Sequence, residues 1–313
     1  MTRTDPHNPG RATILVTGAH RTGTTWVGKM LAAGGEAAYI NEPLNRWHRP
    51  GVMHAPIRHW YTYICPDNEG EFLPALRQTA ALRYHAWTEL KSLRSSKDLL
   101  RMGRDWGIFT RGRILNQRAL LKDPFAVFSA PWFAQRLGCQ VVVTVRHPAA
   151  FSSSLRRLDW DFDFQDLLNQ PLLMRDWLEP FRAEMENSAR GDILTRGALL
   201  WRLVYQAVET YAAQIPCVRI VRHEDLAADP QAGFQGLYEF LGLRFNPAAR
   251  QAVYRSSAAG NPQEPPRSNI HAFRLDSRAS ISHWRRRLTS EEIQRIWSLT
   301  GDLAGRLYPQ ETW

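Results

Sequence analysis

A short glycine-bearing segment, "GAHRTGTT" at residues 18–25, follows an apolar run and has the character of a phosphate-binding loop. Gly18 and Gly23 keep the spacing of the nucleotide pattern G-x-x-x-x-G-K-[ST], but Thr24 stands where that pattern has lysine. The missing lysine removes a positive charge from the place of a γ-phosphate. Backbone N–H groups, threonine hydroxyls and the guanidinium group of Arg21 still suit one tetrahedral anion. The loop therefore indicates a nucleotide with a single 5′ phosphate beside a transferable group, and it demands neither a triphosphate nor a metal.

A second anion-binding candidate follows the apolar run at 139–145. Arg146 ends this run, and Ser154 follows eight residues later on an expected helix, with Pro148 in its first turn. An arginine fork offers fixed charge and two-point geometry to a phosphate monoester, and a hydroxyl adds a further donor.

The elements that must position these residues alternate along the chain. Short apolar runs predict strands at 12–17, 37–40, 119–122, 139–145 and 217–221. Helices are expected at 24–34, 126–137, 148–158, 192–213, 231–241 and 290–307. This pattern predicts an α/β fold with a central parallel sheet. The aromatic, basic segments 45–118 and 159–190 are expected as helical and loop insertions above the carboxyl edge of the sheet, and 258–269 as a surface loop.

Composition limits the setting and the ligands. The 313 residues carry a formal charge of +10, which suggests an anionic ligand, an anionic polymer or nucleic acid. Three widely spaced cysteines provide neither a disulfide framework nor a C-x-x-C site, so a cytoplasmic protein is expected. No apolar run is long enough to span a bilayer, although contact with a membrane surface stays open. Residues 1–11 are expected to be a disordered tail, and 12–313 a single domain.

The motif "RTGTTW", Arg21 to Trp26, resembles the loop of the sulfotransferase family, whose donor is 3′-phosphoadenosine 5′-phosphosulfate (PAPS). The resemblance implies a three-layer α/β/α fold of the P-loop NTPase type. It also implies that the loop amides and hydroxyls hold the 5′ phosphosulfate and that an aromatic ring stacks on adenine. The residues that take these roles are Arg21, Thr22, Gly23, Thr24, Thr25 and Trp26.

Three further segments resemble the family in the same chain order. Arg146 and Ser154 match the pair that binds the donor's 3′ phosphate. "VRHEDLAADP" at 221–230 places His223 where the family has a tyrosine near adenine. "DSRASISHWRRRL" at 276–288 places Arg278 six residues before a tryptophan, as in the segment that closes over the 3′ phosphate, while 285–287 are expected on a solvated face.

The base that would take the acceptor's proton is not the histidine of the cytosolic branch of the family. The corresponding segment "LLKDP" keeps Lys122 but lacks that histidine. Branches that modify glycans carry glutamate after the second strand, and "NEP" here places Glu42 at that point. Glu42 is therefore the expected base, with Arg21 and Lys122 as electrostatic stabilisers. Asp123, His48 and His54 are the alternatives.

The resemblance implies sulfuryl transfer from PAPS, without a metal, to a hydroxyl group, with adenosine 3′,5′-bisphosphate (PAP) as product. A sugar in a polysaccharide or glycolipid is the expected acceptor, and a phenol or lipid alcohol stays open. A P-loop kinase or NTPase is an alternative, but it would need an acidic residue where the strand 139–145 ends in Arg146. A basic nucleic-acid-binding protein is another, although no recognition motif of that kind occurs and no nucleic-acid partner is expected.

Overall fold

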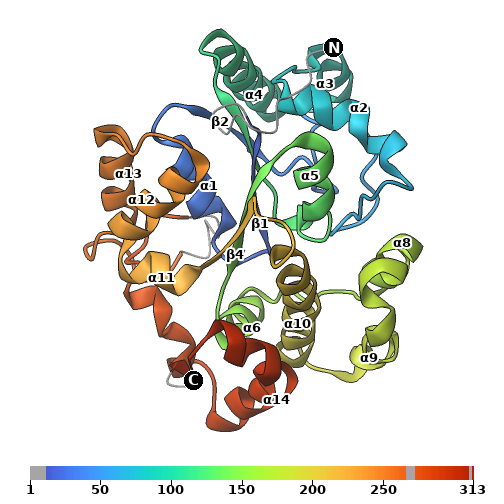
Figure 1. Cartoon of the computed structure of the whole chain (residues 1–313), viewed down its shortest axis with the longest axis vertical. Coiled ribbons are helices and arrows are strands. Elements are labelled where there is room, and N and C mark those ends of the chain that lie inside the picture. The colour runs from blue at the N-terminus through green and yellow to red at the C-terminus, as the bar shows by residue number, and fades with distance from the viewer. Residues whose placement is uncertain (1–11, 266–271, 310–311) are drawn as a thin grey trace.

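The computed structural model describes residues 12–265, 272–309 and 312–313 (Figure 1). The tail predicted at 1–11 lies outside the described residues, as does part of the loop predicted at 258–269. Within the described ranges, no helix combines the length and the apolar character needed to cross a bilayer.

A parallel sheet of five strands forms the centre of the molecule, as predicted. The strands are β1 (Ile14–Gly18), β2 (Ala37–Asn41), β3 (Arg118–Lys122), β4 (Gln140–Val145) and β5 (Val218–Arg222), in the order β2-β3-β1-β4-β5. In this order β2 and β3 lie on one side of the central strand β1, toward one edge of the sheet, and β4 and β5 lie toward the other edge. Such a reversal opens a crevice at the carboxyl edge of the sheet, which is where open α/β folds bind ligands.

Helices cover both faces of this sheet because the strands alternate their buried side chains between two apolar clusters. Ile14 and Val16 point to a cluster with α1 (Thr24–Ala32), α12 (Pro230–Leu241) and α13 (Pro247–Ser257). Leu15 points to the opposite cluster, with α5 (Ala130–Leu137), α6 (Pro148–Leu158) and α10 (Ile193–Ala212). The helix α14 (Ser290–Leu307) packs on α6 and α10 (Figure 1). The predicted α/β fold with helices on both faces is therefore confirmed.

The two predicted insertions are mainly helical. The first contains α2 (Glu69–Ala80), α3 (Ala86–Ser92) and α4 (Ser96–Ile114). The second consists of short helices and turns: α7 (Gln165–Leu168), α8 (Pro171–Leu173), η2 (Met174–Leu178), η3 (Glu179–Phe181), α9 (Arg182–Asn187) and η4 (Ser188–Arg190).

Some elements differ from the sequence prediction. The helix expected at 126–137 is divided into η1 (Pro124–Ala126) and α5, because the side chain of Asp123 accepts the N–H of Phe125 and caps a separate turn. The helices α11 (His223–Ala228) and α13 were not predicted, and η5 (Ala279–Ile281) and η6 (His283–Arg286) are short turns beyond them.

Candidate active site

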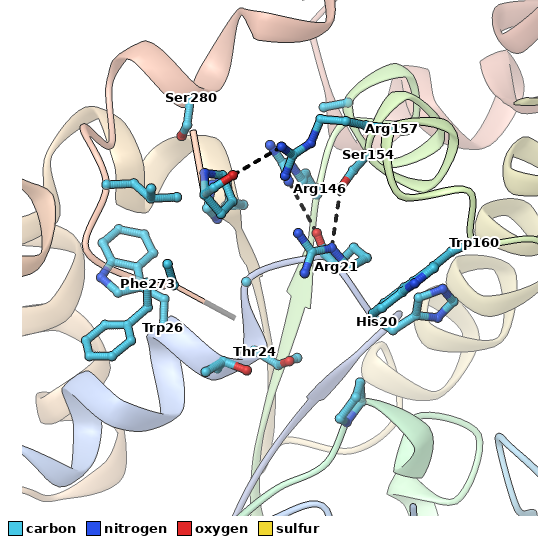
Figure 2. Close-up of a pocket in the computed structure, with 18 of the residues that line it drawn as sticks. His20, Arg21, Thr24, Trp26, Arg146, Ser154, Arg157, Trp160, Phe273 and Ser280 are labelled. Carbon is cyan, nitrogen blue, oxygen red and sulfur yellow. Dashed lines mark hydrogen bonds between the residues drawn. The ribbon is translucent and has the colours of Figure 1, made fainter. Parts of the chain in front are cut away.

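A cavity of about 630 Å³ lies at the carboxyl edge of the sheet (Figure 2). A residue that comes after each of the five strands lines it: His20, Glu42, Pro124, Arg146 and His223. The loop after β1, the start of α1, the helix α6, the two insertions and the carboxyl-terminal third of the chain supply the remaining walls. The volume suits a small-molecule site, for which about 300–1,000 Å³ is usual.

The loop after β1 bends tightly because two of its positions admit only glycine. A Cβ atom on Gly18 would lie 2.3 Å from the carbonyl oxygen of Thr144. Gly23 has a φ of 96°, and its Cβ would lie 2.7 Å from Nδ1 of His223. Thr22 is fully buried, and its hydroxyl donates to the carbonyl of Ala19 at 2.6 Å. Thr22 therefore shapes the loop, and its hydroxyl does not line the cavity as the resemblance implied.

The amino end of α1 faces the cavity. The residue before this helix is Gly23, which has no side chain that could cap the first N–H groups. Thr24 and Thr25 line the cavity beside them. Uncapped N–H groups at a helix start, together with hydroxyls, are a ready anion site.

Trp26 reaches both the cavity and the core. Its indole N–H donates to Oγ of Ser256 at 2.8 Å, and its ring packs edge-on against Phe234 and His223 at 5.1 and 5.7 Å between ring centroids. Trp26 and His223 both line the cavity, where the resemblance places the adenine ring.

Arg21, Arg146 and Ser154 come together at one corner of the cavity (Figure 2). Nε of Arg21 donates to Oγ of Ser154 at 3.4 Å, and Nη1 of Arg146 donates to the carbonyl of Arg21 at 3.3 Å. Burial, followed by the positive charges of Arg146 and Arg157, lowers the pKa of Arg21 to about 10. Nε of Arg146 is buried and has no hydrogen-bond partner among the described residues. This corner therefore has the character of an anion site.

Two arginines that the sequence reasoning missed also line this corner. Arg157 lies three residues after Ser154 on α6, so the helical period puts both on the same face. Helical spacing could have identified it. Arg287 comes from the segment after η6 and pairs with Glu264. It was expected on a solvated face, and no local pattern in the sequence marks it.

Arg278 does not join the other arginines. Its side chain is exposed and its Nε donates to the carbonyl of Ala228 at 3.1 Å. Ser277 and Ser280 take the cavity side of the same turn. The structure therefore brings Arg21, Arg146 and Ser154 together and leaves Arg278 outside.

Glu42 lines the cavity near the loop, and its carboxylate contacts Lys122 and Asn45. Nζ of Lys122 forms an ion pair with Oε1, and Nδ2 of Asn45 donates to Oε2 at 2.7 Å. Lys122 is 1% exposed and does not line the cavity, so its side chain contacts Glu42 from the protein interior. Glu42 and Arg21 both have left-handed φ values, 49° and 69°, in which side-chain-bearing residues are uncommon and which cluster at functional sites.

The alternative bases lie away from the cavity wall. Asp123 is fully buried, and its carboxylate accepts the N–H groups of Leu44 and Phe125. Burial, and then the charge of Glu42, raises the pKa of Asp123 to about 7. His48 contacts the carbonyl of Asn45, and His54 is exposed. None of the three alternatives lines the cavity.

His20 lines the cavity and was not singled out from the sequence. Its backbone N–H donates to the hydroxyl of Tyr61 at 3.4 Å, so that the hydroxyl proton can point to Nδ1, 2.6 Å away. Burial, followed by the charge of Arg21, lowers the pKa of His20 to about 4. The ring is therefore neutral near pH 7.

Aromatic side chains surround the end of the cavity near Glu42. They are Trp47, Trp60, Phe125, Trp160 and Phe162. Trp47 and Trp60 meet edge to face at 4.9 Å, and the guanidinium group of Arg21 lies 5.5 Å from the ring of Trp160. The predicted insertions supply four of these five rings.

Comparison with known proteins finds similarity to sulfotransferases. A family model described as "Sulfotransferase family" matches residues 13–247. Carbohydrate sulfotransferase 5 of Mus musculus is 33% identical over 86 residues, which is 26% of this chain and 21% of that protein. The chain thus aligns with only about a fifth of that relative.

One solved sulfotransferase domain shares the fold. The sulfotransferase domain from the curacin biosynthetic pathway superposes with a TM-score of 0.52 and 16% identity, over 93% of this chain and 98% of that domain. The mouse sulfotransferase SULT7A1, solved in complex with PAP, has a TM-score of 0.46 and 15% identity, over 95% and 88% of the two chains. Because the family model matches most of the chain, including all five strands, the chain belongs to the sulfotransferase family.

Proposed function

We propose that this protein transfers a sulfuryl group from PAPS to a hydroxyl group of a carbohydrate or glycoconjugate, and that residues 12–313 act as one catalytic domain. The observation that carries the proposal is the joining of an anion corner and a carboxylate in one cavity. Family membership favours this reaction over the kinase alternative.

The donor end fits a nucleotide with two anionic groups. The start of α1, with Thr24 and Thr25, would hold the 5′ phosphosulfate, and Arg146 with Ser154 would hold the 3′ phosphate. The buried Nε of Arg146 has no hydrogen-bond partner among the described residues, which supports a ligand beside this guanidinium group. Trp26 and His223 would border the adenine.

The bound donor supplies the sulfuryl group, whose bond to the bridging oxygen is exchanged for a bond to the acceptor oxygen. Glu42 accepts the proton of the acceptor hydroxyl. Lys122 and Asn45 orient the carboxylate through the ion pair and the hydrogen bond described above. Arg21 places positive charge where negative charge develops on the departing phosphate. Lys122 is therefore a positioning residue in this proposal, because it acts through Glu42.

The walls near Glu42 support a sugar as acceptor. Trp47, Trp60 and Trp160 offer flat apolar faces, and Asn45 offers a polar group beside them. Sugar rings combine apolar faces with hydroxyl edges, so they match such a surface. The local similarity to a mouse carbohydrate sulfotransferase agrees with this choice.

The test is incubation with radiolabelled PAPS and a panel of glycans, glycolipids, phenols and aliphatic alcohols, followed by mass spectrometry for added sulfate. Label should move to a sugar hydroxyl, and Arg146→Met should abolish transfer. PAP binding should be measured separately by calorimetry. A protein that binds no PAP, or that sulfates phenols and no sugar, would contradict the donor or the acceptor part of the proposal respectively.

A further inference from the structure

Residues 83–115 include α3 and α4, which lie at the top of Figure 1, and we call their exposed side the α3–α4 surface. This segment exposes more large apolar side chains than the rest of the described chain. Nine large hydrophobic side chains are exposed among the described residues, and seven of them belong to this segment. They are Trp87, Leu90, Leu99, Leu100, Trp106, Ile114 and Leu115. Exposed apolar side chains that gather in this way mark an interaction surface.

The charge of this segment is strongly positive. Eight basic and three acidic residues lie between 83 and 115, so the segment holds five of the ten net positive charges of the chain. All eight basic residues are exposed: Arg83, Lys91, Arg94, Lys97, Arg101, Arg104, Arg111 and Arg113. The acidic residues Glu89 and Asp105 are buried, and Asp98 is half-buried. A partner therefore meets positive charge.

The helical period separates two faces of α4. Asp105, Phe109 and Gly112 are buried against the rest of the fold. Leu100 and Ile114 lie on the side opposite these residues, with exposed fractions of 76% and 77%. Leu99 and Trp106, exposed by 57% each, extend this apolar face toward the buried side.

A row of basic side chains follows the exposed apolar face. Lys97, Arg104 and Arg111 recur every seven residues, and Lys97 and Arg104 lie one helical turn before and after Leu100, so the row borders the apolar face on the Leu100 side. An exposed apolar face beside a basic row is typical of helices that lie in the interface of a membrane.

We propose that the α3–α4 surface docks on a lipid bilayer with anionic headgroups. The apolar side chains enter the interface and the basic row contacts the headgroups. Charge complementarity selects this partner, because the surface exposes eight cations and no fully exposed carboxylate. This inference does not depend on the proposed reaction.

The docking surface is attached directly to the loop that borders the cavity. Arg49 pairs with Glu89 of α3, and its Nη2 donates to the carbonyl of Asp98 in α4 at 3.1 Å. Trp47, two residues earlier, lines the cavity and is 81% exposed. A docked bilayer would therefore lie beside the segment that leads to the acceptor end.

The test is co-sedimentation of the full chain with vesicles of phosphatidylcholine alone or mixed equally with phosphatidylglycerol, at low and at physiological salt. The wild-type protein should bind the anionic vesicles at least about tenfold more strongly than the neutral ones. The triple variant Leu99→Ser, Leu100→Ser and Trp106→Ser should lose about tenfold of this binding at both salt concentrations. These positions are exposed, so an unchanged thermal transition can show that the variant folds.

The charge variant Lys91→Gln, Lys97→Gln and Arg111→Gln should lose the salt-sensitive part of binding. The matched control Tyr254→Ser with Arg255→Gln alters an exposed aromatic and an exposed cation on α13, and should bind as the wild type does. Equal binding to both vesicle types, or wild-type binding by both the serine variant and the charge variant, would overturn the proposal. So would a dimer without vesicles that the serine variant dissociates, or retention on nucleic acid in place of vesicles.

Discussion

Replacing Glu42 by glutamine is the sharpest test of the proposed chemistry. The amide keeps the size of the side chain and can still meet Asn45, but it accepts a proton poorly. Loss of a positioned base lowers the rate by about 10² to 10⁴. This corresponds to about 3–5 kcal/mol in the barrier.

The same substitution also lowers stability, and the size of this loss follows from the burial of Lys122, the ion-pair partner of Glu42. Lys122 is 1% exposed and would keep a buried ammonium group without its counter-charge. Breaking a buried ion pair costs about 3–5 kcal/mol, and the lower end applies because the side chain of Glu42 is 20% exposed. The double variant Glu42→Gln with Lys122→Met removes this unpaired charge. It should recover most of the stability without recovering turnover.

The assay is the initial rate of sulfate transfer at saturating donor, with PAP affinity from calorimetry and unfolding followed by heat. Glu36→Gln is the matched control, because Glu36 pairs with Arg244 at the surface and away from the cavity. Turnover by Glu42→Gln within about fivefold of the wild type would refute the role of Glu42 as base, since the expected loss is at least about 10². Recovery of turnover in the double variant would show that the carboxylate serves only to neutralise Lys122.

Three further outcomes are expected. Arg146→Met should weaken PAP binding at least about 100-fold, measured by calorimetry, because charge-assisted hydrogen bonds to the ligand are lost. Burial lowers the pKa of Arg146, which means that the folded state holds this charge at a cost. The variant without ligand should therefore melt no lower than the wild type in thermal unfolding. Burial, and then the charge of Arg285, lowers the pKa of His147 to about 3, so protons bind more readily to the unfolded chain and stability should fall as the pH drops from about 6.5 toward 3. His147→Asn, which can still accept the N–H of Ala149, should flatten the pH dependence of denaturant midpoints, and an unchanged slope would contradict the assignment. Trp60→Ala should raise the acceptor KM about tenfold with PAP affinity unchanged, and a change in PAP affinity alone would place the ring at the donor end instead.

The strands and long helices could be predicted because each carries a local pattern. The predicted 148–158 and 290–307 agree with α6 and α14 residue for residue, since Pro148 and Thr289 mark the starts and apolar spacing marks the rest. The helix α11 was not predicted because it begins at His223 directly after β5, without a turn between them. The helix α13 did carry a signal, Asn246 as the capping residue before a proline, which was not used.

The residues of the candidate site likewise divide into those that a local sequence pattern predicts and those that it does not. Arg21, Arg146 and Ser154 follow from loop and strand-end patterns and lie together in the structure. Arg287 reaches the cavity from a segment that no pattern links to it, and Arg278 turns away although its spacing matched. Which side of an irregular turn faces a cavity depends on tertiary packing, which spacing alone does not report.

Four guanidinium groups converge on one side of the cavity, those of Arg21, Arg146, Arg157 and Arg287. Glu264 pairs with Arg157 and Arg287, whereas Arg21 and Arg146 act on one another as like charges. A bound anion therefore compensates a repulsion between Arg21 and Arg146 that the unfolded chain does not have. A ligand present at 100 times its dissociation constant adds about 2.7 kcal/mol to stability. Under the proposed function, the resistance of this protein to heat and proteolysis is therefore tied to the supply of PAPS. A cell that runs short of this donor would then hold less of the enzyme that uses it.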